Sequence, residues 1–417
     1  MINKIKQQLI LFDLIAMCFN AYALFHIGSF PITLSVCITS LILIIGVAEC
    51  LSGKKIPIVP FSAYLGIIIL LILSSFFSKY DVDYTSSLLY LFLFSSFLFS
   101  AYQIDRKRFF LGLKFVVFIY TVLSFYGIYQ FFAYMYNLPL QDFFLKGHMV
   151  GGFNTTNLVE LGHFSFYRAH SIYLEPSFLS KFAAIAIVLS LVLYKQRYIE
   201  KINLVCRIII NFCALIVSVA GTGILLLVIC FFVFLIKVIG KPKSNRAKLG
   251  LLFSVMLAAL SLILIFCSDW VIFVYIRTRL GEIFDPSLSG GMRFTSPYLI
   301  TIFSAFRFPF GCGAGNEGFI IEEYAAAMQT PATYETFASG YAKIGCELGL
   351  FGLFLFVVLL WTVKKKNNDI LYLFVILLSI NFLGGNLLQT DFWCWAFLLN
   401  FSEIGKLHGA TVIKEKE

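Results

Sequence analysis

Charged residues are scarce in this sequence. They make up 13% of its 417 residues, whereas 60% are hydrophobic and 18% are aromatic. An average soluble domain is about 45–50% apolar and about 25% charged. The apolar excess comes in blocks of about 20 residues, the length that crosses a bilayer as a helix. The composition therefore excludes an ordinary soluble domain and indicates a membrane protein.

Patterns typical of disulfides and metal sites are also absent. The ten cysteines include no CxxC pair, and most lie inside apolar blocks, where a free cysteine behaves as a small hydrophobe. Histidines and carboxylates form no cluster at metal-ligand spacing. The sequence predicts no disulfide framework, no metal and no cofactor.

Alternation of apolar and polar residues is missing too, which argues against a strand barrel. The N-terminus has a basic start and an apolar run but lacks a small-residue cleavage site, so we expect a retained first helix. The predicted fold is an all-α polytopic membrane protein, a single integral membrane domain over residues 1–417. Its roughly 12 transmembrane helices are placed at 8–27, 30–50, 57–77, 85–104, 109–134, 174–194, 202–219, 222–240, 249–275, 338–363, 369–387 and 391–406.

The formal net charge is +10. Basic residues gather in alternate breaks between the helices, so membrane orientation explains them better than nucleic acid does, and no nucleic-acid partner is expected. The rule that cytoplasmic loops are basic then predicts an inner or plasma-membrane protein with both termini in the cytoplasm. The basic breaks hold Lys4 and Lys6, Lys54 and Lys55, Arg106 to Arg108, Lys195 to Lys201, Lys241 to Lys248, Lys364 to Lys366, and Lys414 and Lys416.

Two long breaks, 135–173 and 276–337, are predicted to be large extracytoplasmic loops. They depart from the charge rule because they carry five arginines: Arg168, Arg277, Arg279, Arg293 and Arg307. Arginine suits phosphate, since its planar fork stays charged and donates paired hydrogen bonds. Near the outer membrane surface, these arginines could bind a lipid-linked diphosphate. Alternatively, they reach lipid headgroups or pair with loop carboxylates.

The first long loop ends in Arg168-Ala-His170-Ser-Ile-Tyr-Leu-Glu175-Pro176, and a helix follows at once. Pro176 suits the first turn of that helix, and Glu175 would lie near its N-cap. Glu175 could instead accept a proton or orient a substrate. His170 is a competing base, because its pKa lies near neutrality.

The second long loop contains Gly311, Gly313 and Gly315. Glycines at alternate positions allow positive φ, and free N–H groups there could bind an anion, although tight turns use glycine for the same reason. The spacing is not a dinucleotide fingerprint.

Few charged residues lie inside the predicted helices, where such residues are costly. Lys343 and Glu347 are four residues apart and could pair along one helix face. Lys114 and Arg207 lie near predicted cytoplasmic ends.

In topology and local motifs the chain resembles the O-antigen polymerase and ligase superfamily, which includes the Wzy-type polysaccharide polymerases. The motifs are Arg168 with Glu175-Pro176, the small-polar break Ser218 to Gly223, Arg293 with the glycine run, and Glu347-Leu-Gly-Leu-Phe-Gly352.

The resemblance implies a glycosyltransferase without metal or nucleotide sugar. It would join undecaprenyl-diphosphate-linked oligosaccharides at the outer face of the bacterial inner membrane, in contact with membrane lipid. A chain-length regulator is a further candidate partner. Ligases carry a His before the helix that follows the large loop, and none occurs in Ala338 to Ala342. That departure favours a polymerase. A ligase and a flippase or transporter of lipid-linked sugars remain alternatives.

The resemblance also suggests roles. Arg293 and Glu175 are the predicted catalytic residues. The predicted substrate-binding residues are Arg168, His170, Arg277, Arg279, Arg307, Gly313 and Gly315.

Overall fold

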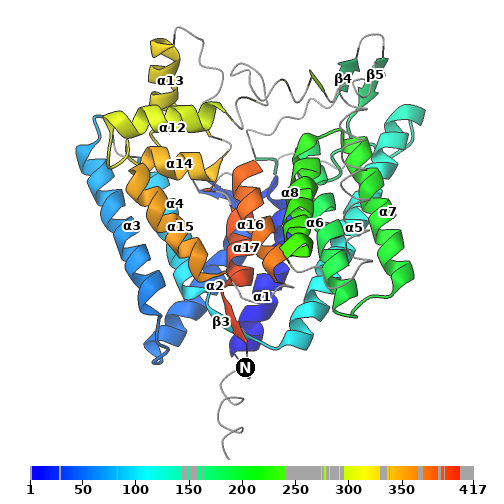
Figure 1. Ribbon diagram of the computed structural model, residues 1–417, viewed down its shortest axis with the longest axis horizontal. Coiled ribbons are helices and arrows are strands. Elements are labelled where there is room, and N and C mark those ends of the chain that lie inside the picture. Colours follow the sequence, from blue (N-terminus) through cyan, green and yellow to red (C-terminus); the bar gives the residue numbers. More distant parts are fainter. Residues whose placement is uncertain are drawn as a thin grey trace, which may run out of the picture.

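The computed structural model of the protein forms a helical bundle (Figure 1). It describes residues 2–27, 30–81, 83–142, 148–150, 158–161, 164–240, 295–328, 336–337, 339–364, 370–383, 387–388 and 390–403, together with residues 274, 277, 278, 281 and 291. The predicted helix at 249–275 falls outside this set except for Val274.

Among the described residues, five helices are long and apolar enough to cross a membrane: α2 (Leu34–Leu51), α3 (Ile58–Phe77), α5 (Arg106–Tyr136), α6 (Pro176–Lys195) and α7 (Lys201–Ser218). Further apolar helices accompany them: α4 (Tyr84–Phe99), α8 (Gly221–Gly240, apolar over Gly221–Ile236), α15 (Gly349–Thr362) and α16 (Leu371–Leu383). The predicted mostly helical, multi-pass architecture is confirmed. The number of 12 spans stays a prediction.

The centre of the bundle is formed by α6 and α17 (Thr390–Leu399) (Figure 1). All ten residues of α17 are buried, as expected for a helix that is apolar on every side and surrounded by other helices. Ten residues extend about 15 Å, half of the roughly 30 Å hydrocarbon layer. The helix predicted at 391–406 is therefore shorter than a full span.

The first predicted helix, 8–27, is displaced in the structure. Helix α1 (Ile2–Ala16) and a 3-10 turn, η1 (Met17–Phe19), end before a hairpin of β1 (Ala23–Ile27) and β2 (Phe30–Thr33). Aromatic and β-branched residues in this stretch favour strands. Ala23 N–H also donates to the His148 carbonyl at 2.6 Å, so the first long loop holds the hairpin in place.

The helix predicted at 85–104 ends early, because Tyr102–Ile104 forms strand β3. This strand pairs in parallel with β6 (Phe401–Glu403), in the region where the last predicted helix was to continue. The helix predicted at 338–363 is two helices, α14 (Gly340–Glu347) and α15, separated at Leu348. Gly349 has φ +70°, which a continuous helix does not allow.

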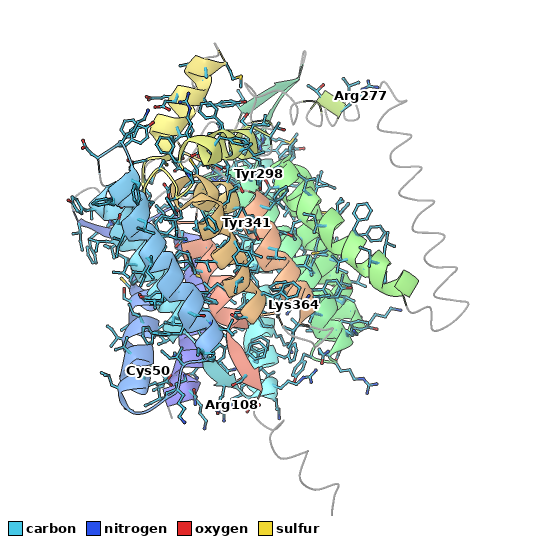
Figure 2. The ribbon with its side chains drawn as sticks, turned by 60° about the vertical axis from the view of Figure 1, so that its left-hand side comes forward. Cys50, Arg108, Arg277, Tyr298, Tyr341 and Lys364 are labelled. Carbon is cyan, nitrogen blue, oxygen red and sulfur yellow. The ribbon has the colours of Figure 1, made fainter. Side chains whose placement is uncertain are left out.

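The two ends of the bundle differ in composition. Basic side chains gather at one end, where Lys6 Nζ and Lys54 Nζ both contact the Ala101 carbonyl, and Figure 2 shows Arg108 there. The opposite end carries α14 and pieces of both long loops: β4 (Leu158–Leu161), β5 (Phe164–Tyr167), α12 (Ser296–Arg307) and α13 (Glu317–Ala327) (Figure 1). We call this the loop end.

Candidate functional site

The predicted site residues that the structure describes lie at the loop end, in two groups. One group surrounds the N-terminus of α6 and the other surrounds α12 to α14. Arg277 also lies at this end, opposite Arg108 (Figure 2). Arg279 and Arg293 lie outside the described residues.

Arg168 lies between β5 and α6 and is held against the end of α7. Its Nε donates to the Ser218 carbonyl at 3.2 Å, and the next residue's N–H donates to the Val217 carbonyl at 3.1 Å. The guanidinium is half-buried and fixed by the backbone of the predicted helix break.

That break is confirmed. Helix α7 ends at Ser218, Val219 has φ +46°, and α8 begins at Gly221. Ser180 of α6 joins both sides, since its hydroxyl donates to the Ala220 carbonyl and accepts from Gly223 N–H, each at 2.9 Å. A Cβ at Gly223 would lie 2.2 Å from the Ser180 carbonyl oxygen, so the close contact requires glycine.

His170 is fully buried and belongs to a polar cluster. Its Nε2 lies 3.1 Å from Asp142 Oδ1, and its backbone N–H donates to Gln130 Oε1 at 2.9 Å. Tyr167 OH also donates to Asp142, at 3.1 Å. Burial would raise the pKa of Asp142, but hydrogen bonds from His170 and its tyrosine neighbours hold it below its usual value. His170 therefore positions the loop against α5, and sequence spacing gave no sign of Asp142 or Gln130 as its partners.

Glu175 is the N-cap residue of α6, with Pro176 in the first turn, as predicted. Its side chain is half-buried and makes no capping bond to the helix backbone; instead it accepts from Ser177 Oγ at 2.9 Å. The carboxylate is thus positioned at the loop end without being used to cap the helix.

The segment before Glu175 is strained. Ser171 and Leu174 have φ of +57° and +64°, and both are buried. Left-handed backbone is unfavourable for a branched residue such as leucine, and such strain gathers at functional sites. Arg168, His170 and Glu175 are therefore held by a segment whose shape costs energy.

Arg307, in the second group, pairs with a loop carboxylate, one of the two alternatives that the sequence left open. Its Nη1 lies 2.7 Å from Glu323 Oε2, and its guanidinium lies 4.5 Å from the Phe303 ring centre. Lys79 and Tyr80 bind the other oxygen of Glu323. Burial acts to raise the pKa of Glu323, and these bonds bring it below its usual value. Glu323 gave no signal in the sequence.

The glycine run makes internal contacts. Gly313 N–H donates to the Glu347 carbonyl at 3.1 Å, and Gly315 N–H donates to Glu347 Oε1 at 2.8 Å. The sequence allowed these N–H groups to bind an anion or to serve a tight turn. In the structure, Gly313 N–H is bonded to a backbone carbonyl and Gly315 N–H to the chain's own carboxylate. A Cβ at Gly311, where φ is +92°, would lie 2.1 Å from the Glu347 carbonyl oxygen.

Lys343 and Glu347 pair along α14 as predicted, with 3.0 Å between Nζ and Oε1. The structure adds Glu317 of α13 as a second partner of Lys343, and Tyr90 OH donates to Glu347. Burial raises the pKa of Glu317. All four side chains are buried, so this cluster joins α13 and α14 to the bundle.

Within the described part of the chain, no group of three or more His, Cys, Asp or Glu side chains could hold a metal ion. The predicted residues thus form a strained, hydrogen-bonded group at α6 and an ion-paired group at α12 to α14.

Comparison with known proteins adds one family match. No curated protein matches the chain. The Wzy_C family model, described as O-antigen ligase, matches residues 207–357, from within α7 to within α15. The matched region includes Arg277, Arg307, the glycine run and Glu347. This match covers about a third of the chain and supports the resemblance to the O-antigen polymerase and ligase superfamily that the sequence indicated.

Proposed function

We propose that this protein is a polysaccharide polymerase that joins repeat units linked to undecaprenyl diphosphate at the loop end of the bundle. The family acts on lipid-linked glycans in the membrane. The observation that carries the proposal is the segment from Arg168 to Glu175, in which a fixed guanidinium and a half-buried N-cap carboxylate flank two strained residues.

In the proposed reaction, a hydroxyl of one lipid-linked unit attacks the anomeric carbon of the growing glycan. The bond between that carbon and the diphosphate oxygen breaks, and undecaprenyl diphosphate leaves. Glu175 accepts the hydroxyl proton, while Arg168 and Arg293 bind the developing negative charge. Fixed cations at such a position are effective because they need no rearrangement during the reaction.

Arg277 and Arg279 are second choices for the diphosphate. Arg307 takes a smaller part in this proposal, because Glu323 already neutralises its charge. His170 orients the segment through Asp142 and does not act as the base, because the ring is buried.

A ligase is the second candidate, and the description of the matching family model favours it. The two reactions share the donor and differ in the acceptor. The polymerase proposal is supported by the absence of the ligases' His from the segment Ala338 to Ala342. A flippase is less favoured, because the strained segment and the described arginines, Arg168, Arg277 and Arg307, lie at the loop end.

The test uses a deletion strain complemented with wild type, Arg293→Ala or Arg108→Ala. Arg108 is the matched control, an exposed arginine at the opposite end. Surface glycan is then sized on a gel. A polymerase predicts single-repeat glycan in the deletion, and a ladder restored by wild type and Arg108→Ala but not by Arg293→Ala.

Full-length polymer accumulating on undecaprenyl diphosphate would establish the ligase instead. Repeat units retained at the cytoplasmic face would establish the flippase. A normal ladder with Arg293→Ala at normal protein level would remove Arg293 from the site.

A further inference from the structure

A polar cavity lies at the basic end of the bundle, opposite the proposed reaction site. Its volume is about 590 Å³, within the range of small-ligand sites. It lies between α5, the last turn of α6 and the start of α7. It is lined by Lys114, Tyr194, Lys195, Arg197, Tyr198, Ile199, Glu200 and Asn203.

The lining has the chemistry of an anion site. Three basic side chains, Lys114, Lys195 and Arg197, face a single carboxylate, Glu200. Two tyrosine hydroxyls and the amide of Asn203 add neutral hydrogen-bond donors. Such a set suits a phosphate, which accepts several hydrogen bonds at once.

The backbone around the cavity is fixed. Arg197 has φ +62°, and its N–H donates to the Tyr194 carbonyl at 2.9 Å. Arg106 Nη2 donates to Gln196 Oε1 at 3.1 Å, which joins the α6–α7 turn to the start of α5. Tyr198 stacks on Phe110 of α5, with 5.2 Å between ring centres. The cavity is therefore built by three elements.

A further cation lies close by on α7. Arg207 follows Asn203 by four residues and so shares its helix face, one turn deeper in the bundle. Its Nη1 is buried and has no hydrogen-bond partner among the described residues. Buried guanidinium nitrogens are normally hydrogen-bonded, so this one adds a further donor for an anion near the cavity.

Apolar side chains on the same three helices distinguish a lipid from a free anion. Four large apolar side chains near the cavity lining are exposed: Leu111 and Phe115 of α5, Leu191 of α6 and Ile202 of α7. A lipid whose phosphate entered the cavity would lay its acyl chains along these residues. Tyrosine is also typical of the depth at which headgroups lie.

We infer that this cavity binds the phosphate headgroup of an anionic phospholipid at the basic face of the membrane. Basic pockets between transmembrane helices are known to take such headgroups. The site is separate from the proposed reaction and concerns a resident lipid, so it holds whether the enzyme is a polymerase or a ligase.

The experiment is native mass spectrometry of the full-length protein extracted from vesicles of phosphatidylcholine and phosphatidylglycerol in equal proportions. Wild type should retain phosphatidylglycerol in preference to phosphatidylcholine. Lys114→Gln with Arg197→Gln should weaken this retention by about tenfold or more, since each basic residue contributes to headgroup binding. Lys55→Gln with Lys107→Gln is the control, because it removes the same charge from exposed positions at the same end.

Equal retention of the two lipids by wild type, or an equal loss in the control, would overturn the assignment. Displacement of the lipid by millimolar inorganic phosphate would show that the site binds free phosphate and would overturn the assignment to a phospholipid. If the double variant is poorly folded by size-exclusion chromatography, Arg197→Gln alone gives the same comparison, because Arg197 is exposed.

Discussion

His170 Nε2 lies 3.1 Å from Asp142 Oδ1, although the two residues are 28 positions apart in the first long loop. The contact closes the loop over the end of α5 and sets the position of the segment that carries Arg168 and Glu175. The pKa of Asp142 is held below its usual value, so the stability that this carboxylate contributes is lost in acid.

Asp142→Asn should lower the free energy of unfolding by about 1.5–3 kcal/mol near neutral pH, the usual contribution of a hydrogen bond to a charged group. Because the folded pKa of Asp142 is depressed, its stabilisation is complete above the unfolded pKa of about 3.9 and is lost as pH falls through the folded pKa. Thermal unfolding of the two proteins in detergent, between pH 6 and about pH 3, should therefore converge toward acid. The exposed Asp81→Asn serves as control; a constant gap across the range would contradict the prediction.

Arg168→Ala should reduce glycan chain growth on the order of 10²-fold, as expected when one charge-stabilising donor is removed from a reaction site. Arg168→Lys should restore part of the activity, because it keeps the charge and loses the bond to Ser218. The readout is incorporation into polymer by membranes normalised to protein level. Activity in Arg168→Ala equal to that of the control Arg108→Ala would show that Arg168 serves the fold alone.

Lys343→Met should destabilise the protein by about 3–5 kcal/mol, because it leaves Glu317 and Glu347 buried without a cation. Adding Glu317→Gln and Glu347→Gln should recover much of that loss, since the charges are then removed together. Folded yield and thermal midpoint in detergent measure the loss in the single variant and its recovery in the triple variant. A triple variant less stable than the single one would mean that the carboxylates have other essential partners.

Gly311→Ala should cost about 1–3 kcal/mol, because alanine strains the positive φ and its Cβ meets the Glu347 backbone. Gly221→Ala is the matched control: nothing lies within 4 Å of a Cβ there, so the change should be neutral or slightly stabilising. Comparing thermal midpoints tests the pair. Equal effects would show that the turn adjusts.

Composition and hydropathy determined the class of this protein and the placement of most helices. The apolar blocks at 57–77, 174–194 and 202–219 correspond closely to α3, α6 and α7, because a bilayer requires a continuous apolar helix of nearly fixed length. The break at Ser218 to Gly223, the N-cap position of Glu175 and the Lys343–Glu347 pair were also readable, since each depends on residues close in sequence.

Only the tertiary structure decided which distant residues meet. Strand β3 exists because Phe401–Glu403 lies beside it, and no local pattern near Tyr102 indicates that partner. The glycine N–H groups bind Glu347, and Arg307 binds Glu323, where the sequence allowed an anionic substrate for both. Local sequence fixes helix length and capping, whereas the choice between a ligand and a neighbouring side chain depends on packing between segments far apart in the chain.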